Sequence, residues 1–402
     1  MATFDEQRLD DERALAEVDP GLSLRALAGA GAQVRTAVHA AAEAGLDRLE
    51  GLGPRGVVVG AAGGSACVGD LLEALTRVGG AVPVQTVTSA PLPGWVGALD
   101  LVVAVSQSGR AAGALALAAE AGRRGASLLT VGAPDSPLAD LSARHHGIHV
   151  PVRVDGAGSR TSMWAQAAPV LLAADVLGLA SVPPGLLAEL ADVLDDRARR
   201  SGPATESFDN PAKLLACEVA ESAAIVLGDG PFGGVAARRA AEMFGRTGRM
   251  PVTSGALPDA ASQVVACFDG PLAGQGDAGG GGRDIFADPF LDGPSRPPLR
   301  LVLLRDTSPL PPPDPRAADG AELVDDPSVA ARRLAQTVES VADDAGVRIS
   351  RVDSDASSPL LRLASHVALT DFAATYLAIG HGYDPATSPH VQLLRGARPG
   401  HA

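Results

Sequence analysis

The sequence predicts an α/β protein of two similar domains in tandem, each a parallel sheet covered by helices. Short, continuously apolar runs alternate with longer segments in which apolar residues recur every three or four positions. This alternation is typical of buried parallel strands joined by amphipathic helices. The pattern occurs twice along the chain, and 402 residues exceed the length of one ordinary domain. Two domains are therefore expected.

The N-terminal domain, residues 1–182, opens with a helical pattern at 22–49 that we expect to be interrupted near Gly29–Gly31. Strands and helices then alternate, and a helix at 161–179 closes the domain. The predicted strands are GVVVG at 56–60, VPVQTV at 82–87, LDLVVAV at 99–105 and SLLTVG at 127–132, with helices between them at 67–78 and 111–125. A polar helix and a Pro-, Ser- and Asp-rich joint at 183–209 predict a linker.

The C-terminal domain, residues 210–402, repeats the alternation. Its predicted strands lie at 223–230, 250–255, 299–306 and 347–352, and its predicted helices at 233–248, 326–346 and 360–382. Residues 270–298 are rich in glycine and proline, which predicts a flexible surface insertion. The two domains indicate a divergent duplication rather than a short-period repeat.

Composition and charge exclude several classes of partner. The net charge of −14 and an aromatic content of 3% provide neither a basic face nor stacking platforms for nucleic acid. Three widely spaced cysteines predict no disulfide framework and no CxxC metal site, and His145, His146 and His149 are interpreted as a solvated turn. The N-terminal residues are acidic, and no apolar run reaches membrane-spanning length. We expect a soluble, cytoplasmic protein that binds neither a metal nor a membrane.

The loop GAAGGSACVGD at 60–70 follows the first predicted strand and opens a helix. Its glycines do not have the dinucleotide spacing G-x-G-x-x-G, and it has no lysine of the P-loop type, so no nucleotide cofactor is expected. Gly64 would let the backbone approach an anion closely. Ser65 could donate its hydroxyl beside the N–H groups of the first helical turn. A simple helix cap is the alternative interpretation.

A second turn of the same chemistry follows the strand at 99–105. The motif SQSG places Ser106, Ser108 and Gly109 between that strand and the next helix. Ligands of open parallel sheets bind at the carboxyl ends of the strands. Two hydroxyl-bearing turns at one sheet edge therefore predict a pocket for an anion carried by a small molecule, with a serine helix cap again as the alternative.

These motifs resemble the sugar isomerase (SIS) domain, a phosphosugar-binding fold. The whole chain is similar to the bifunctional phosphoglucose/phosphomannose isomerase family, in a divergent form found in high-GC bacteria. The similar segments are GAAGGSACVGDLL (60–72), SQSGR (106–110), GSRTSMW (158–164), NPAKLLA (210–216) and LTDFAATYLAIGHGYDP (369–385). The resemblance implies two SIS domains, each a five-stranded parallel sheet flanked by helices. It also implies a homodimer that converts glucose 6-phosphate or mannose 6-phosphate to fructose 6-phosphate.

The resemblance also implies roles for single residues. Arg160 matches the family's active-site arginine, which would stabilise negative charge on the enediol oxygens during isomerisation; a surface ion pair is the alternative. Ala111 stands where the family has a further threonine, so the pocket has one donor fewer. Arg395 matches the family's terminal lysine and keeps its charge, but it cannot donate a proton as lysine can. The residues that would hold the sugar phosphate are Gly64, Ser65, Ser106, Ser108 and Gly109.

The proton-transferring part of the family's site is not matched. The family's base is a Glu in an N-E-N-A-K-like motif, and its ring-opening group is a His that follows Leu-Pro-Glu. Neither motif is complete here, and no His occurs between His149 and His366. The nearest carboxylate is Glu242, whose alternative role is an i,i+4 ion pair with Arg246 or Arg238. The further candidates for relocated acid and base groups are Asp259, His366 and His381.

Two functions therefore stay open. One is an aldose–ketose isomerase with relocated catalytic groups, since such a reaction needs a base to move the proton between the two carbons. The other is a non-catalytic phosphosugar-binding or regulatory protein that uses the same pocket. The chain-long resemblance favours the isomerase, with eroded catalytic motifs.

Overall fold

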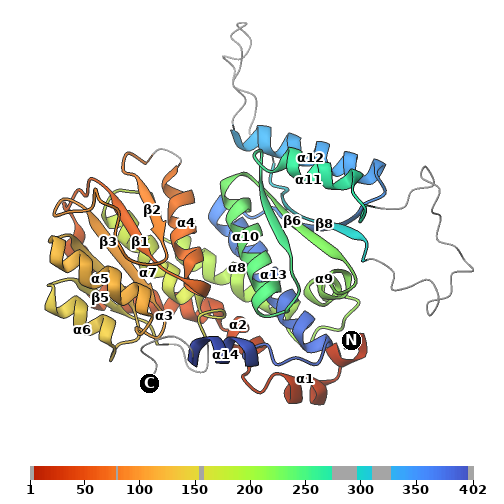
Figure 1. The fold of residues 1–402 in the computed structure, drawn as a ribbon, viewed down its shortest axis with the longest axis horizontal. Helices are drawn as coiled ribbons and strands as arrows, with labels where there is room; N and C mark the ends of the chain where they lie inside the picture. The colour runs from red at the N-terminus through yellow and green to blue at the C-terminus, as the bar shows by residue number, and fades with distance from the viewer. Residues whose placement is uncertain (1–3, 78–79, 154–157, 274–296, 310–326, 397–402) are drawn as a thin grey trace, which may run out of the picture. The chain divides into compact units, whose positions relative to one another are not determined.

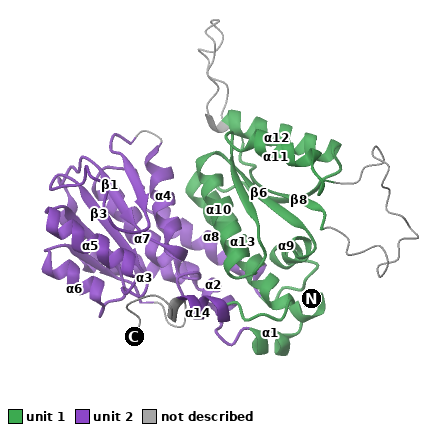
Figure 2. Ribbon diagram, viewed as in Figure 1, with its two compact units in different colours: residues 1–18, 203–385 green, residues 19–202, 386–402 purple. Residues whose placement is uncertain are grey.

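The chain folds as two compact units, each built around its own parallel sheet (Figure 1). A computed structural model describes residues 4–77, 80–153, 158–273, 297–309 and 327–396. One unit comprises residues 19–202 and 386–402, and the other comprises residues 1–18 and 203–385 (Figure 2). We call them the five-stranded unit and the four-stranded unit. The predicted α/β class with two tandem parallel sheets is confirmed, and whether residues 182 and 210 bound separately folding domains stays a prediction.

The five-stranded unit has the strand order β2-β1-β3-β4-β5, with every neighbouring pair parallel. Its strands are β1 (Val57–Gly60), β2 (Val84–Val87), β3 (Leu101–Ser106), β4 (Ser127–Gly132) and β5 (Ile148–Pro151). Its helices are α2 (Ser23–Ala28), α3 (Ala30–Glu43), α4 (Ala66–Arg77), α5 (Ala112–Arg124), α6 (Pro137–Arg144), α7 (Met163–Val176), α8 (Leu186–Ser201) and α14 (Pro389–Gly396). The helix predicted at 22–49 is interrupted at Gly29, as expected.

The core of this unit is filled by small aliphatic side chains. All residues of β1 and β3 are buried, because helices cover both faces of these central strands. Val58 and Val102 pack with Leu117 of α5 and Leu138 of α6 on one side of the sheet. The continuous apolar runs in the sequence thus correspond to strands without a solvent-facing side.

The four-stranded unit has the order β7-β6-β8-β9, also fully parallel. Its strands are β6 (Ala223–Asp229), β7 (Thr253–Leu257), β8 (Leu299–Asp306) and β9 (Arg348–Ser354). Its helices are α1 (Glu12–Val18), α9 (Pro211–Ala220), α10 (Gly230–Arg246), α11 (Ala261–Ala266), α12 (Pro327–Asp344) and α13 (Pro359–Gly380). Residues 274–296 of the predicted insertion lie outside the described residues.

The expected fifth strand is not present in the described part of this second sheet. In the five-stranded unit, β4 is followed by α6 and β5 before α7 begins. In the four-stranded unit, β9 ends at Ser354 and α13 begins at Pro359. This connection is too short for a helix and a strand, so no strand lies between β9 and α13.

Lys213, the only lysine of the chain, ties the N-terminal segment to the four-stranded unit. Its buried ammonium group donates to Asp10 Oδ1 at 2.8 Å, to Pro203 O at 3.1 Å and to Thr205 O at 2.8 Å. These three hydrogen bonds use all the donors of an ammonium group. Burial opposes ionisation of Asp10 and is the largest single influence on it, but the hydrogen bonds from Lys213 and Ser207 together with the Lys213 charge outweigh burial and lower the pKa of the Asp10 carboxyl. This contact explains why the N-terminal residues belong to this unit.

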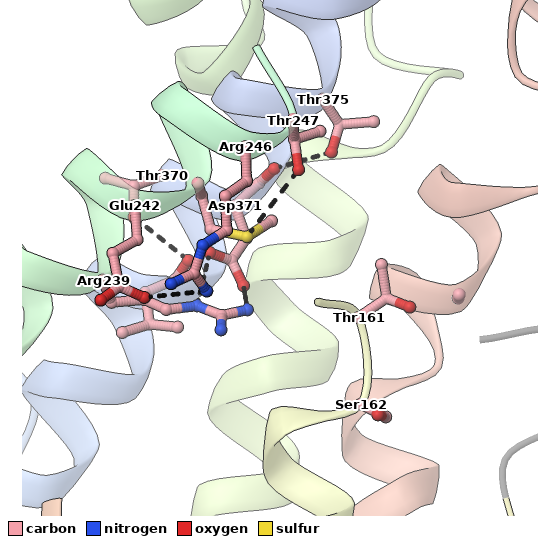
Figure 3. A network of polar contacts seen from close by, with 12 residues as sticks. Thr161, Ser162, Arg239, Glu242, Arg246, Thr247, Thr370, Asp371 and Thr375 are labelled. Carbon is pink, nitrogen blue, oxygen red and sulfur yellow. Dashed lines mark hydrogen bonds and ion pairs between the residues drawn. The ribbon is translucent and has the colours of Figure 1, made fainter. Parts of the chain in front are cut away.

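A second buried charge joins α10 to α13. Arg239 and Asp371 are only 1% and 4% exposed. The guanidinium donates from Nε to Asp371 Oδ1 at 3.2 Å and from Nη2 to Oδ2 at 2.8 Å, so the pair is bidentate (Figure 3). Burial raises the pKa of Asp371, and the charge of Arg239 opposes that shift. Loss of either side chain would leave the other charge buried and unpaired, which strongly destabilises the folded state.

We expect the Arg239→Met substitution to lower the free energy of unfolding by roughly 3–5 kcal/mol, because it leaves the Asp371 carboxylate buried and unpaired. The double variant Arg239→Met/Asp371→Leu should recover most of the loss, since it removes both charges. Urea denaturation followed by circular dichroism measures both. Arg13→Met is the control, because the Arg13–Glu17 pair is exposed and should not change the midpoint. A double variant as unstable as the single one would contradict the interpretation.

Candidate functional site

The strand order of the five-stranded unit reverses between β1 and β3. The chain leaves β1 toward β2 on one side and leaves β3 toward β4 on the other. Because such crossovers are right-handed, α4 and α5 cover opposite faces of the sheet. The carboxyl ends of β1 and β3, which pair as Gly60 with Ala104, therefore lie at the topological switch point of the sheet, which we call the crevice of this sheet. This is the position at which open parallel sheets bind their ligands.

The turn after β1 is built on glycine. Gly63 has φ +63°, a conformation that side chains rarely adopt. Gly64 is buried against the backbone of Ser159, and a Cβ atom on Gly64 would lie 2.6 Å from Ser159 O. Ser65 ends this turn, and α4 begins at the next residue. The backbone of the turn is thus packed directly against the chain segment that carries Arg160.

The turn after β3 presents two serine side chains. Ser106 Oγ accepts the N–H of Ala111 at 3.3 Å, and Ser108 Oγ accepts the N–H of Arg110 at 3.3 Å. A hydroxyl oxygen that accepts a backbone N–H keeps its own proton for a bond that it donates. Gly109 has φ +64°, and a Cβ there would meet Ser136 Oγ at 2.1 Å. The backbone therefore requires glycine at position 109, and the two serine hydroxyls beside it each keep a proton that they can donate.

Ser65 behaves differently from these two serines. It is 3% exposed, and its hydroxyl donates to Gln166 Oε1 of α7 at 2.6 Å. The hydroxyl proton is therefore directed toward α7 rather than into the crevice. The phosphate-holding role that the sequence predicts for Ser65 stays a prediction.

Arg160 lies in the turn that leads into α7 and is half-buried. The turn is held by Ser162 Oγ, which donates to Gly158 O at 3.0 Å. Gln33 of α3 supports it from the other side, since its Nε2 donates to Thr161 O at 3.1 Å. The five-stranded unit thus brings the two serine-bearing turns and the Arg160 turn to the same sheet edge. Arg395 also belongs to this unit, in α14.

The other candidate acid and base groups belong to the four-stranded unit. Glu242 forms the i,i+4 ion pair with Arg246, at 3.1 Å, that was the alternative to a catalytic role. The imidazole of His381 packs against the rings of Phe4 and Tyr383, with centroids 5.3 and 5.9 Å away. His366 is buried within α13, and Asp259 lies in the turn before α11. Their catalytic roles stay predictions.

The crevice of the second sheet has the same topology but different chemistry. Here the carboxyl ends of β6 and β8 carry Asp229 and Asp306. Asp229 Oδ2 accepts the backbone N–H of Asp306 at 3.0 Å. Asp306 forms ion pairs with Arg332 and with Arg362, the latter at 3.0 Å. The arginines of this crevice are thus neutralised by a carboxylate of the protein, and burial together with the Asp306 charge raises the pKa of Asp229.

Among the described residues, no group of three or more His, Cys, Asp or Glu side chains is placed to hold a metal ion. Of the histidines at 145–149, His149 lies on β5 beside Thr130, with Nδ1 and Oγ1 2.8 Å apart, and burial lowers its pKa. Burial raises the pKa of Cys217 to about 11, so its thiol is a poor nucleophile at neutral pH. None of the helices in the described ranges could span a bilayer.

Several important residues were not found by the sequence reasoning. Gln166 gave a usable signal, since it is a lone carboxamide in the apolar run MWAQAAPVLL. The carboxylates at the ends of β6 and β8 could have been found by the same strand-end reasoning that selected the serines. The pairing of Arg239 with Asp371 could not have been found in this way, because the two residues are 132 positions apart.

Comparison with known proteins supports the predicted resemblance. Residues 208–397 match the family described as "Bacterial phospho-glucose isomerase C-terminal SIS domain". A hypothetical protein from Thermus thermophilus has a similar structure, with TM-score 0.66 and 16% identity over 97% of this chain and 92% of that one. The C-terminal domain of glucosamine-fructose-6-phosphate aminotransferase from Francisella tularensis has TM-score 0.59 and 13% identity over 90% and 97%. No curated protein matches the sequence.

We expect Asp229→Asn to stabilise the protein at neutral pH. A carboxyl whose folded pKa is raised contributes stability that is present below its unfolded pKa and is lost as the pH rises through its folded pKa. Asparagine keeps the acceptor for the Asp306 N–H but carries no charge. The melting temperature of the variant should exceed that of the wild type at pH 8, and the difference should shrink toward pH 4.

Asp100→Asn is the matched control with the opposite sign. Asp100 is buried, and its hydrogen bonds with Arg55 lower its pKa. Its contribution is present above the unfolded pKa and is lost as the pH falls through the folded pKa. The variant should be less stable than the wild type at pH 8 and similar to it in acid. A lower melting temperature for Asp229→Asn at pH 8 would contradict the interpretation of the second crevice.

Proposed function

We propose that the chain, whose residues 208–397 match a bacterial phospho-glucose isomerase SIS-domain family, is a phosphosugar-binding protein of this kind and binds its ligand at the carboxyl ends of β1 and β3. The single observation that carries this proposal is the convergence of two small-residue turns on one sheet edge. The hydroxyls of Ser106 and Ser108 supply donors on one side of the crevice. The Gly63–Ser65 turn and the start of α4 supply a helix N-terminus on the other.

A hexose phosphate fits the chemistry of this edge. Hydroxyl and main-chain donors suit the oxygens of a phosphoryl group, and Arg160 adds a cation in a turn packed against Gly64. Fructose 6-phosphate is part of the name of the similar aminotransferase. The crevice of the other sheet is less suited to an anion, since Asp229 and Asp306 carry negative charge there.

The activity that we propose is aldose–ketose isomerisation of glucose 6-phosphate or mannose 6-phosphate to fructose 6-phosphate, with eroded catalytic motifs. The reaction needs a base that carries the proton from C2 to C1 and a cation that stabilises the enediolate. Arg160 is our candidate for the cation. Glu242, His381 and Arg395 are the candidates for the proton-transferring and charge-stabilising groups.

A non-catalytic phosphosugar-binding or regulatory protein is the second candidate function. Two observations favour it: Glu242 is engaged by Arg246, and the His381 ring packs between aromatic side chains. An acid or base already held by structural contacts is a weaker proton carrier. The binding site is the same for both functions.

Proton NMR of fructose 6-phosphate in deuterium oxide distinguishes the two functions. An isomerase incorporates deuterium at C2 of an aldose product, and we expect slow incorporation. Calorimetry on the same sample measures binding independently. Binding without deuterium incorporation would favour the regulatory protein, and the absence of binding for every hexose phosphate would contradict both functions.

We expect Ser108→Ala to weaken hexose phosphate binding roughly tenfold or more, because a hydrogen bond to a charged group contributes about 1.5–3 kcal/mol. Isothermal titration calorimetry measures the change. Ser127→Ala is the control, because Ser127 begins β4 at the opposite end of the sheet and should leave the affinity unchanged. Equal affinities for wild type and Ser108→Ala would show that the second turn does not hold the phosphate.

The homodimer implied by the family resemblance remains part of this proposal. Light scattering at micromolar protein concentration should give twice the chain mass of 40.4 kDa. A monomer under those conditions would remove the dimer from the proposal without affecting the binding site.

A further inference from the structure

Gln166 is a buried polar side chain in an apolar part of the protein. It is 0% exposed, and the other buried residues of α7 are apolar or aromatic. Burying a carboxamide without hydrogen bonds is unfavourable. The partners that Gln166 has therefore define the local structure.

The orientation of the Gln166 amide is fixed by its neighbours. Nε2 donates to Ser162 O at 3.1 Å and to Ser162 Oγ at 3.2 Å. A backbone carbonyl can only accept, so the amide nitrogen must face Ser162 and the amide oxygen must face Ser65. Ser65 then has to donate its hydroxyl proton to Oε1, at 2.6 Å.

These contacts connect two parts of the proposed site. Ser65 belongs to the glycine turn after β1, and Ser162 closes the turn that contains Arg160, through its bond to Gly158 O. The same two turns touch directly where Gly64 packs on Ser159. The side-chain amide of Gln166 therefore forms hydrogen bonds with both turns, in addition to the direct contact between Gly64 and Ser159.

We propose that Gln166 is a positioning residue that couples the Gly63–Ser65 turn to the Arg160 turn, so that phosphate donors and cation keep one spacing. This inference rests on the proposed function for its effect on binding. It assigns Ser65 an indirect role: its hydroxyl anchors the turn to α7, while the backbone of the turn faces the ligand. Gln166 itself touches neither the phosphate nor the reacting carbons.

Hydrogen–deuterium exchange tests the coupling without any ligand. Gln166→Leu keeps a similar side-chain volume and removes the hydrogen bonds with both Ser65 and Ser162. We expect faster amide exchange in residues 63–66 and in residues 158–162 together. Thr130→Val is the matched control, because Thr130 is equally buried and bonds His149 on β5; its loss should leave both segments unchanged. Unchanged exchange in either segment of Gln166→Leu would overturn the coupling.

A double-variant cycle with Ser65→Ala tests how the coupling acts on binding. If Gln166 acts through Ser65, each single variant should bind fructose 6-phosphate roughly tenfold more weakly, the size of one lost buried hydrogen bond. The double variant should be no weaker than the singles. If the loss of affinity in the double variant equals the product of the two single losses, Gln166 does not act through Ser65. Ser65→Ala also serves if Gln166→Leu does not fold, since it breaks the same bond from the other end.

The two proposals fail in different ways. If wild-type protein binds no hexose phosphate, the proposed function fails, while the exchange experiment still decides whether Gln166 couples the two turns. If the wild type binds and Gln166→Leu binds equally well with unchanged exchange, the positioning role fails and the proposed function stands.

Discussion

The parallel pairing of β1 with β3 is the constraint on which the candidate site depends. The chain leaves these two strands in opposite directions, so their carboxyl ends are not covered by a shared helix. The turns that follow these strands are built on glycine. Gly63 and Gly109 have positive φ, and a side chain would collide with Ser159 at Gly64 and with Ser136 at Gly109. The anion binding that we propose depends on this backbone geometry.

The second sheet shows that topology alone does not determine the ligand. Its strands β6, β8 and β9 follow the same order as β1, β3 and β4, and its central crevice occupies the equivalent position. Yet Asp306 already pairs with the two arginines there. A carboxylate within the protein thus takes the place that an anionic ligand could have. Two side chains at the strand ends thus make the corresponding edges of the two sheets chemically different.

The sequence predicted well what depends on local pattern. Apolar runs of buried strands and the Gly-Ser turns after them are recognisable within a few residues, so each strand predicted from an apolar run is present. Contacts between distant positions were not predictable. Gln166 forms a hydrogen bond with Ser65, 101 positions away, and Arg239 pairs with Asp371, 132 positions away. In the described residues the second sheet has four strands, one fewer than the resemblance implied. The connection from Ser354 to Pro359 is too short for a further helix and strand after β9.

The two parts of the proposed site tolerate sequence change differently, which makes binding the stronger part of the inference. Phosphate binding uses main-chain amides and short hydroxyls, and the fold itself positions these at the ends of β1 and β3. Proton transfer instead needs one titratable side chain within hydrogen-bond reach of one carbon-bound proton. Glu242 in its ion pair with Arg246 and His381 in its aromatic contacts already have structural roles. Sugar phosphate binding at the proposed site therefore does not depend on the groups that proton transfer would need.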